Sequence, residues 1–142
     1  MPAKAEPAKP AAPPKPAAGP SDGAVQMLGL LQRDARLVDF LMEDVAPYSD
    51  DQIGAAVRDV HAKAKQVLER HLKLAPVIDG VEGDFTKADG IAAVSIRWIG
   101  NVPASGKAPG GLLRHKGWKA EKIDLPAAAP GSVIAPAELE VE

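Results

Sequence analysis

The fold is decided by residues 21–72, which read SDGAVQMLGLLQRDARLVDFLMEDVAPYSDDQIGAAVRDVHAKAKQVLERHL. Apolar residues recur in this stretch at steps of three and four, which is the spacing of one face of an α-helix. The pattern predicts two amphipathic helices joined by the short connection Val45-Ala46-Pro47-Tyr48. Because so short a connection brings consecutive helices side by side, we expect an antiparallel two-helix hairpin.

The second helix has the clearer start signal. Ser49 and Gln52 form a capping box, in which the Ser49 hydroxyl accepts from the Gln52 backbone N–H and the Gln52 side chain reaches back. Pro76 prevents the helix from continuing far past Leu74. Val60 lies near the centre of the apolar stripe, so we expect it to be buried. The stripe consists of Ile53, Val57, Val60, Ala64, Val67 and Leu68.

The first helix is predicted to begin at Ser21 or Asp22, which are both favourable N-caps. Its apolar arc spans about 160°, wide enough to cover both the partner helix and a sheet. Asp34 lies in the middle of that arc, where a buried carboxylate needs a partner. The arc consists of Met27, Leu30, Leu31, Ala35, Leu37, Val38, Leu41, Met42 and Val45.

We expect the partner of Asp34 to be His61. Residues of two antiparallel helices lie level when they are equally far from the turn, here near Pro47 and Tyr48, because the rise per residue is equal. The resulting Asp34–His61 contact would set the register of the hairpin. A structural role for this pair is favoured, and a functional one stays open, because ion pairs perturb pKa values in both settings.

Residues 1–20 differ from the rest in composition. They hold seven of the fourteen prolines, with alanines and three lysines between them. A segment with no apolar pattern cannot offset its own ordering entropy, so we predict a disordered N-terminal tail that contributes nothing to folding. The alternative is a polyproline ligand for a partner domain. Residues 21–142 are predicted to form a single α+β domain.

The composition excludes several classes of function. The chain has no cysteine, which excludes disulfides and thiolate metal sites. No apolar run approaches the roughly 18 residues of a membrane span, and the start of the chain lacks the apolar core of a signal peptide. The net charge is only −2, but residues 97–122 are strongly basic. The lack of cysteine fits a reducing compartment, and we expect no cofactor, no metal and no membrane contact.

The second half of the chain is predicted to consist of short strands. The candidates are residues 72–78, 84–86 and 91–99, two strands at 112–115 and 118–125 that flank a Lys116-Gly117 turn, and an edge pairing at 132–134. Residues 91–99 carry the strongest alternation, with Val94, Ile96 and Trp98 on one face. Two helices followed by strands favour an α+β fold, in which the hairpin packs on a small antiparallel β-meander.

Three segments resemble motifs with known chemistry, but their residue spacing does not match these motifs. The acidic loop 79–84 lacks the ligand positions of a calcium loop, and Gly106-Lys107 lacks both the spacing and the following Ser/Thr of a phosphate loop. His61 and His71 are ten residues apart, which is not the spacing of two ligands on one helix face. His71 is expected to be a packed histidine that donates to a nearby carbonyl.

Several blocks resemble a bacterial family known as a domain of unknown function (DUF2760-like). They are LLQR at 30–33, LVDFL at 37–41, YSDDQIGAAVR at 48–58, GNV at 100–102, HKGW at 115–118 and SVIAPAE at 132–138. The likeness covers residues 23–141 and implies a small bacterial cytoplasmic protein. It also implies an accessory role beside Hsp70-like chaperones, and it supplies no catalytic residues. The chain has no His-Pro-Asp tripeptide, so it is not a J-domain.

Three functions are compatible with the sequence. A non-enzymatic protein-interaction or chaperone-accessory module is favoured, because no catalytic constellation is recognisable. A small-ligand binder or enzyme would use Asp34, His61 and Arg97, and would need a cavity of a few hundred Å³ near them. A weak nucleic-acid binder would use the basic segment 97–122, with Trp98 and Trp118 stacking on bases.

Overall fold

The computed structural model describes residues 20–126 and 131–142. The chain divides into two compact units. We call residues 72–123 the strand unit, and the remaining described residues, 20–71, 124–126 and 131–142, the helical unit. The α+β class, with helices and small antiparallel sheets, is confirmed. The predicted tail lies outside the described residues, except for Pro20, with which the first helix begins.

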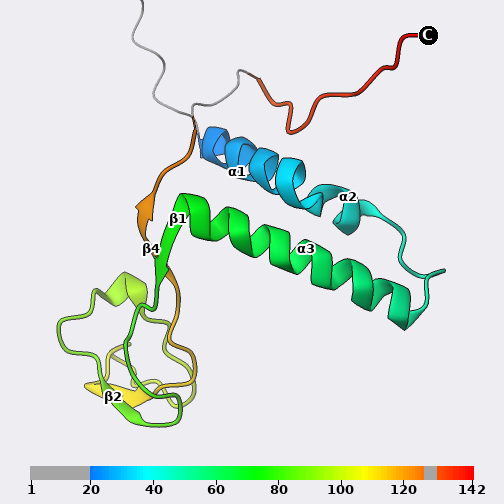
Figure 1. Cartoon of the computed structure of the whole chain (residues 1–142). Helices are drawn as coiled ribbons and strands as arrows, with labels where there is room; N and C mark the ends of the chain where they lie inside the picture. The colour runs from blue at the N-terminus through cyan, green and yellow to red at the C-terminus, as the bar shows by residue number, and fades with distance from the viewer. Residues whose placement is uncertain (1–19, 127–130) are drawn as a thin grey trace, which may run out of the picture. The chain divides into compact units, whose positions relative to one another are not determined.

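The helical unit holds three helices, α1 (Pro20–Ala35), α2 (Leu37–Met42) and α3 (Asp50–His71). Figure 1 shows α1 and α3 side by side, as the predicted hairpin requires. The first helix of the hairpin is divided at Arg36, whose φ of 54° lies in the left-handed region. Gln32 is 6 % exposed, and its Oε1 accepts the backbone N–H of Asp39 at 3.1 Å. A buried side chain of α1 therefore satisfies one of the free N–H groups at the start of α2.

The start of α3 matches the predicted capping box. The Gln52 backbone N–H donates to Ser49 Oγ at 3.3 Å, and the Ser49 N–H donates to Gln52 Oε1 at 3.0 Å. Asp50 and Asp51 occupy the first turn, where the helix dipole favours negative charge. Local sequence alone accounts for this end of the helix.

Burial between α1 and α3 is deepest near the end of α3. Val67 is 1 % exposed and packs in the same core as Leu30 and Ala35, whereas Val60 is only half-buried and Val57 is 43 % exposed. The expectation that Val60 marks the buried centre is therefore wrong. The helix is interrupted at Arg36, so α1 packs on the second half of α3. The first half of α3 faces the short α2 and the connection that follows it, and these cover it less.

The strand unit contains two small antiparallel sheets. Strand β1 (Leu72–Ala75) pairs with β4 (Lys119–Ile123), and β2 (Phe85–Lys87) pairs with β3 (Gly110–Leu112). Backbone hydrogen bonds between the sheets continue the pairing, since Ile78 N donates to Lys116 O at 3.0 Å and Leu113 N donates to Asp84 O at 2.9 Å. Residues 72–88 and 109–123 thus form one antiparallel ribbon, closed by the loop 89–108. The strands pair in this nested order, whereas a meander pairs consecutive strands.

Two of the predicted strands and the predicted hairpin differ from the structure. Residues 91–99 form no strand but a 3₁₀ turn (Ala93–Ser95), and Val94 is 94 % exposed. The segment lies in the loop of the ribbon, where no described strand offers it a backbone ladder. The predicted hairpin at Lys116-Gly117 is wrong, because its two flanks pair with β2 and β1 instead of with each other. Residues 132–134 form no strand.

Gly110 lies where the two sides of the ribbon approach each other closely. A Cβ at this position would collide with the carbonyl oxygen of Thr86, to which the backbone lies too close for any side chain. We expect Gly110→Ala to disrupt the β2–β3 pair and to lower the free energy of unfolding by about 1–3 kcal/mol. The measurement is urea unfolding of the full chain. Gly83→Ala is the comparison, because a Cβ there meets open space and only its φ of +95° opposes the substitution. Equal stability of Gly110→Ala and the wild type would contradict this pairing.

The depth of burial along α3 gives a second prediction. Val67→Asp places an unpaired carboxylate in the core and should abolish cooperative melting of the helical unit, because its desolvation is comparable to the stability of a small domain. Val60→Asp should cost less, since its side chain retains contact with solvent. Circular dichroism melts of both variants test the order. A Val60→Asp variant that is the less stable of the two would show that the core is centred elsewhere.

Candidate functional site

The strand unit contains a cavity of about 580 Å³. Its walls come from four stretches of chain, around Val77, Lys87, Ile96 and Leu113, which the ribbon and its loop bring together. This volume lies within the range of roughly 300–1,000 Å³ that is typical of ligand sites. Of the three candidate site residues, Arg97 lines the cavity, while Asp34 and His61 belong to the helical unit.

Every charged side chain that lines the cavity is basic. The set consists of Lys87, Arg97, Arg114 and Lys116, joined by His115. Lys87, Arg97 and Arg114 are exposed and Lys116 is half-buried. Within the part of the chain that the structure describes, none of these four cations forms an ion pair. We call this site the basic cavity.

His115 adds a hydrogen-bond donor to the basic cavity. The backbone N–H of Gly117 donates to His115 Nδ1 at 3.1 Å. Because Nδ1 accepts, a neutral His115 ring carries its proton on Nε2. The ring therefore offers an N–H in addition to the four cations.

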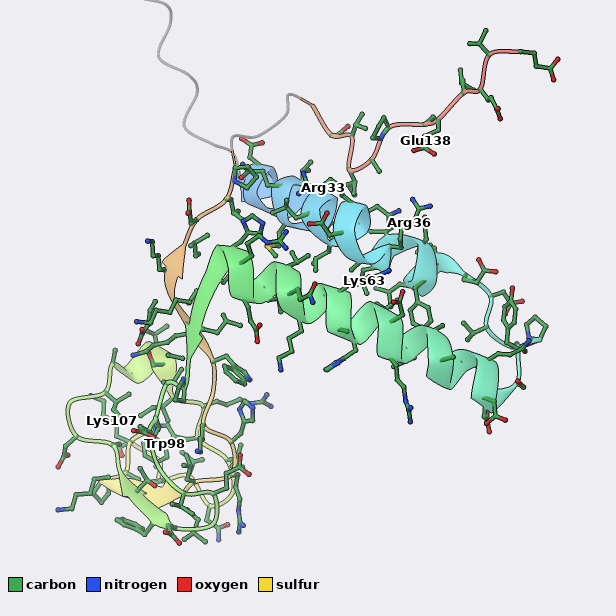
Figure 2. The ribbon with its side chains drawn as sticks, in the orientation of Figure 1. Arg33, Arg36, Lys63, Trp98, Lys107 and Glu138 are labelled. Atoms are coloured by element: carbon green, nitrogen blue, oxygen red, sulfur yellow. The ribbon has the colours of Figure 1, made fainter. Side chains whose placement is uncertain are left out.

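The inner wall of the basic cavity is apolar. Leu113 is 6 % exposed, and Val77, Ile96 and Trp98 are half-buried. Gly117 approaches this wall with a φ of 73°, and a Cβ there would lie 3.0 Å from Val77 Cγ2. Figure 2 labels Trp98 within the strand unit. An apolar floor below exposed cations suits a ligand that carries both negative charge and apolar groups.

Alternation along one extended stretch places two of these groups. Ile96 and Trp98 are half-buried while Ser95 and Arg97 are exposed. The predicted alternation of buried and exposed side chains is therefore present in residues 95–98. Its half-buried side chains form a cavity wall and do not belong to a sheet. Trp98 packs toward Gly111, whose missing Cβ would lie 3.8 Å from the ring, while Arg97 lines the cavity from the exposed side.

Asp34 forms ion pairs with two arginines. Its Oδ1 lies 3.0 Å from Arg33 Nε and its Oδ2 lies 3.5 Å from Arg70 Nη1, with 28 % of the aspartate side chain exposed. His61 is exposed on α3. The predicted Asp34–His61 contact is therefore wrong. The connection 43–49 is not helical and rises more per residue than a helix, so Asp34 comes level with a residue further along α3.

Electrostatics around Asp34 favour its ionised form. The hydrogen bond from Arg33 lowers the pKa of the carboxyl group most, partial burial opposes this, and the nearby charges of Arg33, Arg70 and His71 lower it further. His71 is held by the returning chain, because its Nδ1 lies 3.0 Å from the carbonyl oxygen of Asp124 and its own carbonyl accepts the Asp124 N–H at 2.7 Å. The expected packed histidine, bonded to a carbonyl, is confirmed. These contacts fasten the end of α3 and give the cluster a structural role.

The described residues present neither a metal-binding cluster nor a membrane-spanning helix. Residues 20–126 and 131–142 contain no group of three His, Asp or Glu side chains that could hold a metal ion. No helix in the same residues is long and apolar enough to cross a membrane.

A family model described as a domain of unknown function (DUF2760) matches residues 20–140. The chain belongs to this family. Comparisons with curated proteins and with solved structures gave no match. The match spans both units, so the hairpin and the basic cavity both lie within the DUF2760 region.

Sequence reasoning found part of the basic cavity of this DUF2760 domain. The basic character of residues 97–122 indicated Arg97, Arg114 and Lys116, but Lys87 lies outside that segment and joins them only through the pairing of β2 with β3. Arg70 was missed as the partner of Asp34. The prediction assumed the rise of a helix throughout, and the non-helical connection 43–49 departs from that rise. The position of Arg70 in the last turn of α3 was the available signal.

The lowered pKa of Asp34 predicts how stability depends on acid pH. A carboxyl group with a lowered folded-state pKa contributes stability above its unfolded-state pKa and loses it as the pH falls through the folded-state pKa. We expect Asp34→Asn to cost up to about 1 kcal/mol at neutral pH, and nothing at a pH below both values. Urea unfolding over a pH series measures this difference.

The matched control is Asp59→Asn, which removes an exposed pair with Lys63 on α3. It should change the stability by less than about 0.5 kcal/mol across the series. A difference between Asp34→Asn and the wild type that is constant down to strongly acid pH would rule out the ion pair as its cause.

Proposed function

We propose that this DUF2760 domain is a non-enzymatic protein-interaction module, and that its basic cavity receives an acidic segment of a partner protein that also carries apolar side chains. The observation that carries the proposal is the set of cations without ion pairs around an apolar-walled cavity. Such cations attract a negatively charged partner over several ångströms and speed its association. The apolar wall contributes affinity that charge alone does not provide.

A peptide segment suits the basic cavity better than a single-stranded nucleic acid does. Stacking sites for bases use successive aromatic side chains, whereas Trp98 is the one Trp, Tyr or Phe among the residues that line this cavity. Trp118 is 70 % exposed and lies outside its lining. The volume of the cavity also admits a small anionic molecule, and this is the second candidate for its ligand.

We place the protein in the bacterial cytoplasm, in line with the resemblance of its sequence blocks, and take an Hsp70-like chaperone as the first partner to examine. This assignment is supported by the sequence resemblance. The basic cavity adds a chemical requirement, because the partner surface must present carboxylates beside apolar side chains. No cofactor is needed for this role.

The test uses three short peptides of equal length, with blocked ends, in which Leu alternates with Glu, Gln or Lys. We expect the Glu peptide to bind the full chain at least about tenfold more tightly than the Gln peptide, because only its carboxylates meet the cations. The Lys peptide should not bind. Binding is measured by calorimetry, and affinity should fall as salt rises, since the cations are largely exposed.

Two variants locate the binding. Arg97→Glu combined with Arg114→Glu should abolish binding of the Glu peptide, because both residues line the basic cavity. Lys107→Glu combined with Lys119→Glu makes the same change of net charge outside the cavity and should lower affinity by no more than about threefold. Equal losses in both variants, or equal binding of all three peptides, would refute the proposal. Binding of a small anion at the same site, with no binding of the Glu peptide, would favour the second candidate.

A further inference from the structure

Residues 138–142 have the composition that the basic cavity requires. They read Glu-Leu-Glu-Val-Glu, so carboxylates and apolar side chains alternate. Figure 2 shows Glu138 on an uncoiled stretch of chain, and no helix or strand includes these residues. Leu139 is 91 % exposed and Val141 is 93 % exposed. We call residues 138–142 the acidic segment.

Within the described residues of its own unit, neither the acidic segment nor the basic cavity has a charged partner. Ion pairs there involve Glu69 and Glu121 but not Glu138, Glu140 or Glu142. The cations of the cavity are likewise without ion pairs. Two complementary sets of exposed charge on the same kind of molecule, each unpaired within its own unit, can be satisfied together when two copies meet.

We propose that the acidic segment of one copy docks in the basic cavity of a second copy. In an extended backbone, alternate side chains point to opposite faces. Leu139 and Val141 would then lie against the apolar wall around Trp98 and Leu113, with the glutamates beside the exposed cations. Reciprocal docking of two copies closes a dimer, whereas one-way docking extends into a chain of copies.

The chain packs on the helical unit shortly before the acidic segment begins. The carbonyl oxygen of Ile134 lies 3.2 Å from the position that a Cβ of Gly29 would occupy on α1. The backbone of Ile134 therefore packs directly on α1, and Gly29→Leu would displace it. The residues that follow, up to Glu142, are exposed and carry the docking groups. The inference rests on the proposed function, because it names one partner for the same cavity.

The test is complementation between two defective full-length variants. The cavity variant carries Arg97→Glu and Arg114→Glu. The segment variant carries Glu138→Gln, Glu140→Gln and Glu142→Gln. We expect wild type to self-associate in sedimentation velocity at low salt, each variant alone to associate at least about tenfold more weakly, and an equimolar mixture to recover association. Recovery is expected because the cavity variant keeps a working segment and the segment variant keeps a working cavity.

The control variant, Lys107→Glu with Lys119→Glu, should self-associate within about threefold of wild type, as these lysines lie outside the cavity lining. Persistence of self-association in the segment variant would overturn the inference. A wild type that stays monomeric would also overturn it. If the amide NMR signals of the cavity in such a monomer shift when the acidic segment is neutralised, the segment docks within one copy.

Failure of this inference can be told from failure of the proposed function. If the alternating Glu–Leu peptide binds the basic cavity while the full chain stays monomeric, the cavity takes acidic segments of other proteins, and only self-recognition is refuted. If neither that peptide nor a second copy binds, both proposals fall together. Folding of each variant is checked by its thermal melt, which should match wild type because every substituted side chain is exposed.

Discussion

The strand unit depends on one constraint, the backbone pairing of residues 72–88 with residues 109–123. Each of its two sheets has only two strands, and an isolated two-stranded sheet is marginally stable in water. The pairing must also offset the entropy of closing the loop 89–108, a cost that grows slowly with loop length. The hydrogen bonds of Ile78 and Leu113 matter for this reason, since they join two weak pairs into one longer ribbon. The need for glycine at residue 110 follows from the same close approach.

The pairing of this ribbon brings the cations of the basic cavity together, and their mutual repulsion lowers the stability of the ribbon. Lys87 comes from one side, Arg114 and Lys116 come from the other, and Arg97 comes from the loop. Like charges that share a site repel one another, and exposure to solvent limits this cost by screening. A ligand that carries negative charge would relieve the repulsion, and it would stabilise the folded state by mass action. Cations that form no ion pair among the described residues add nothing to the stability of the strand unit, which is in line with the binding role that we propose for them.

A feature of the fold could be predicted from the sequence when the residues that produce it are close together along the chain. The capping box at Ser49 and the period of the helices are local, so they were predicted correctly. The break at Arg36 was missed because it depends on Gln32, which reaches across to the N–H of Asp39. Strand partners were missed because pairing between distant segments leaves little local trace. Alternation at Ile96 and Trp98 correctly indicated a half-buried surface, but alternation alone does not distinguish a sheet from a cavity wall.

The helical unit shows how polar groups restrict an arrangement that apolar packing leaves loose. Leu30, Ala35 and Val67 are its buried apolar side chains among the described residues, and they lie toward one end of the hairpin. Asp34 and Arg70 make their ion pair close to Ala35 and Val67 along the chain. At the other end Met42 is 81 % exposed, and no comparable polar contact joins α2 to α3 in the described residues. Because buried contacts and ion pairs set the register only where they occur, the register of α1 on α3 is defined at the Val67 end. The connection then adapts to it, which is why counting residues back from the turn gave the wrong partner for Asp34.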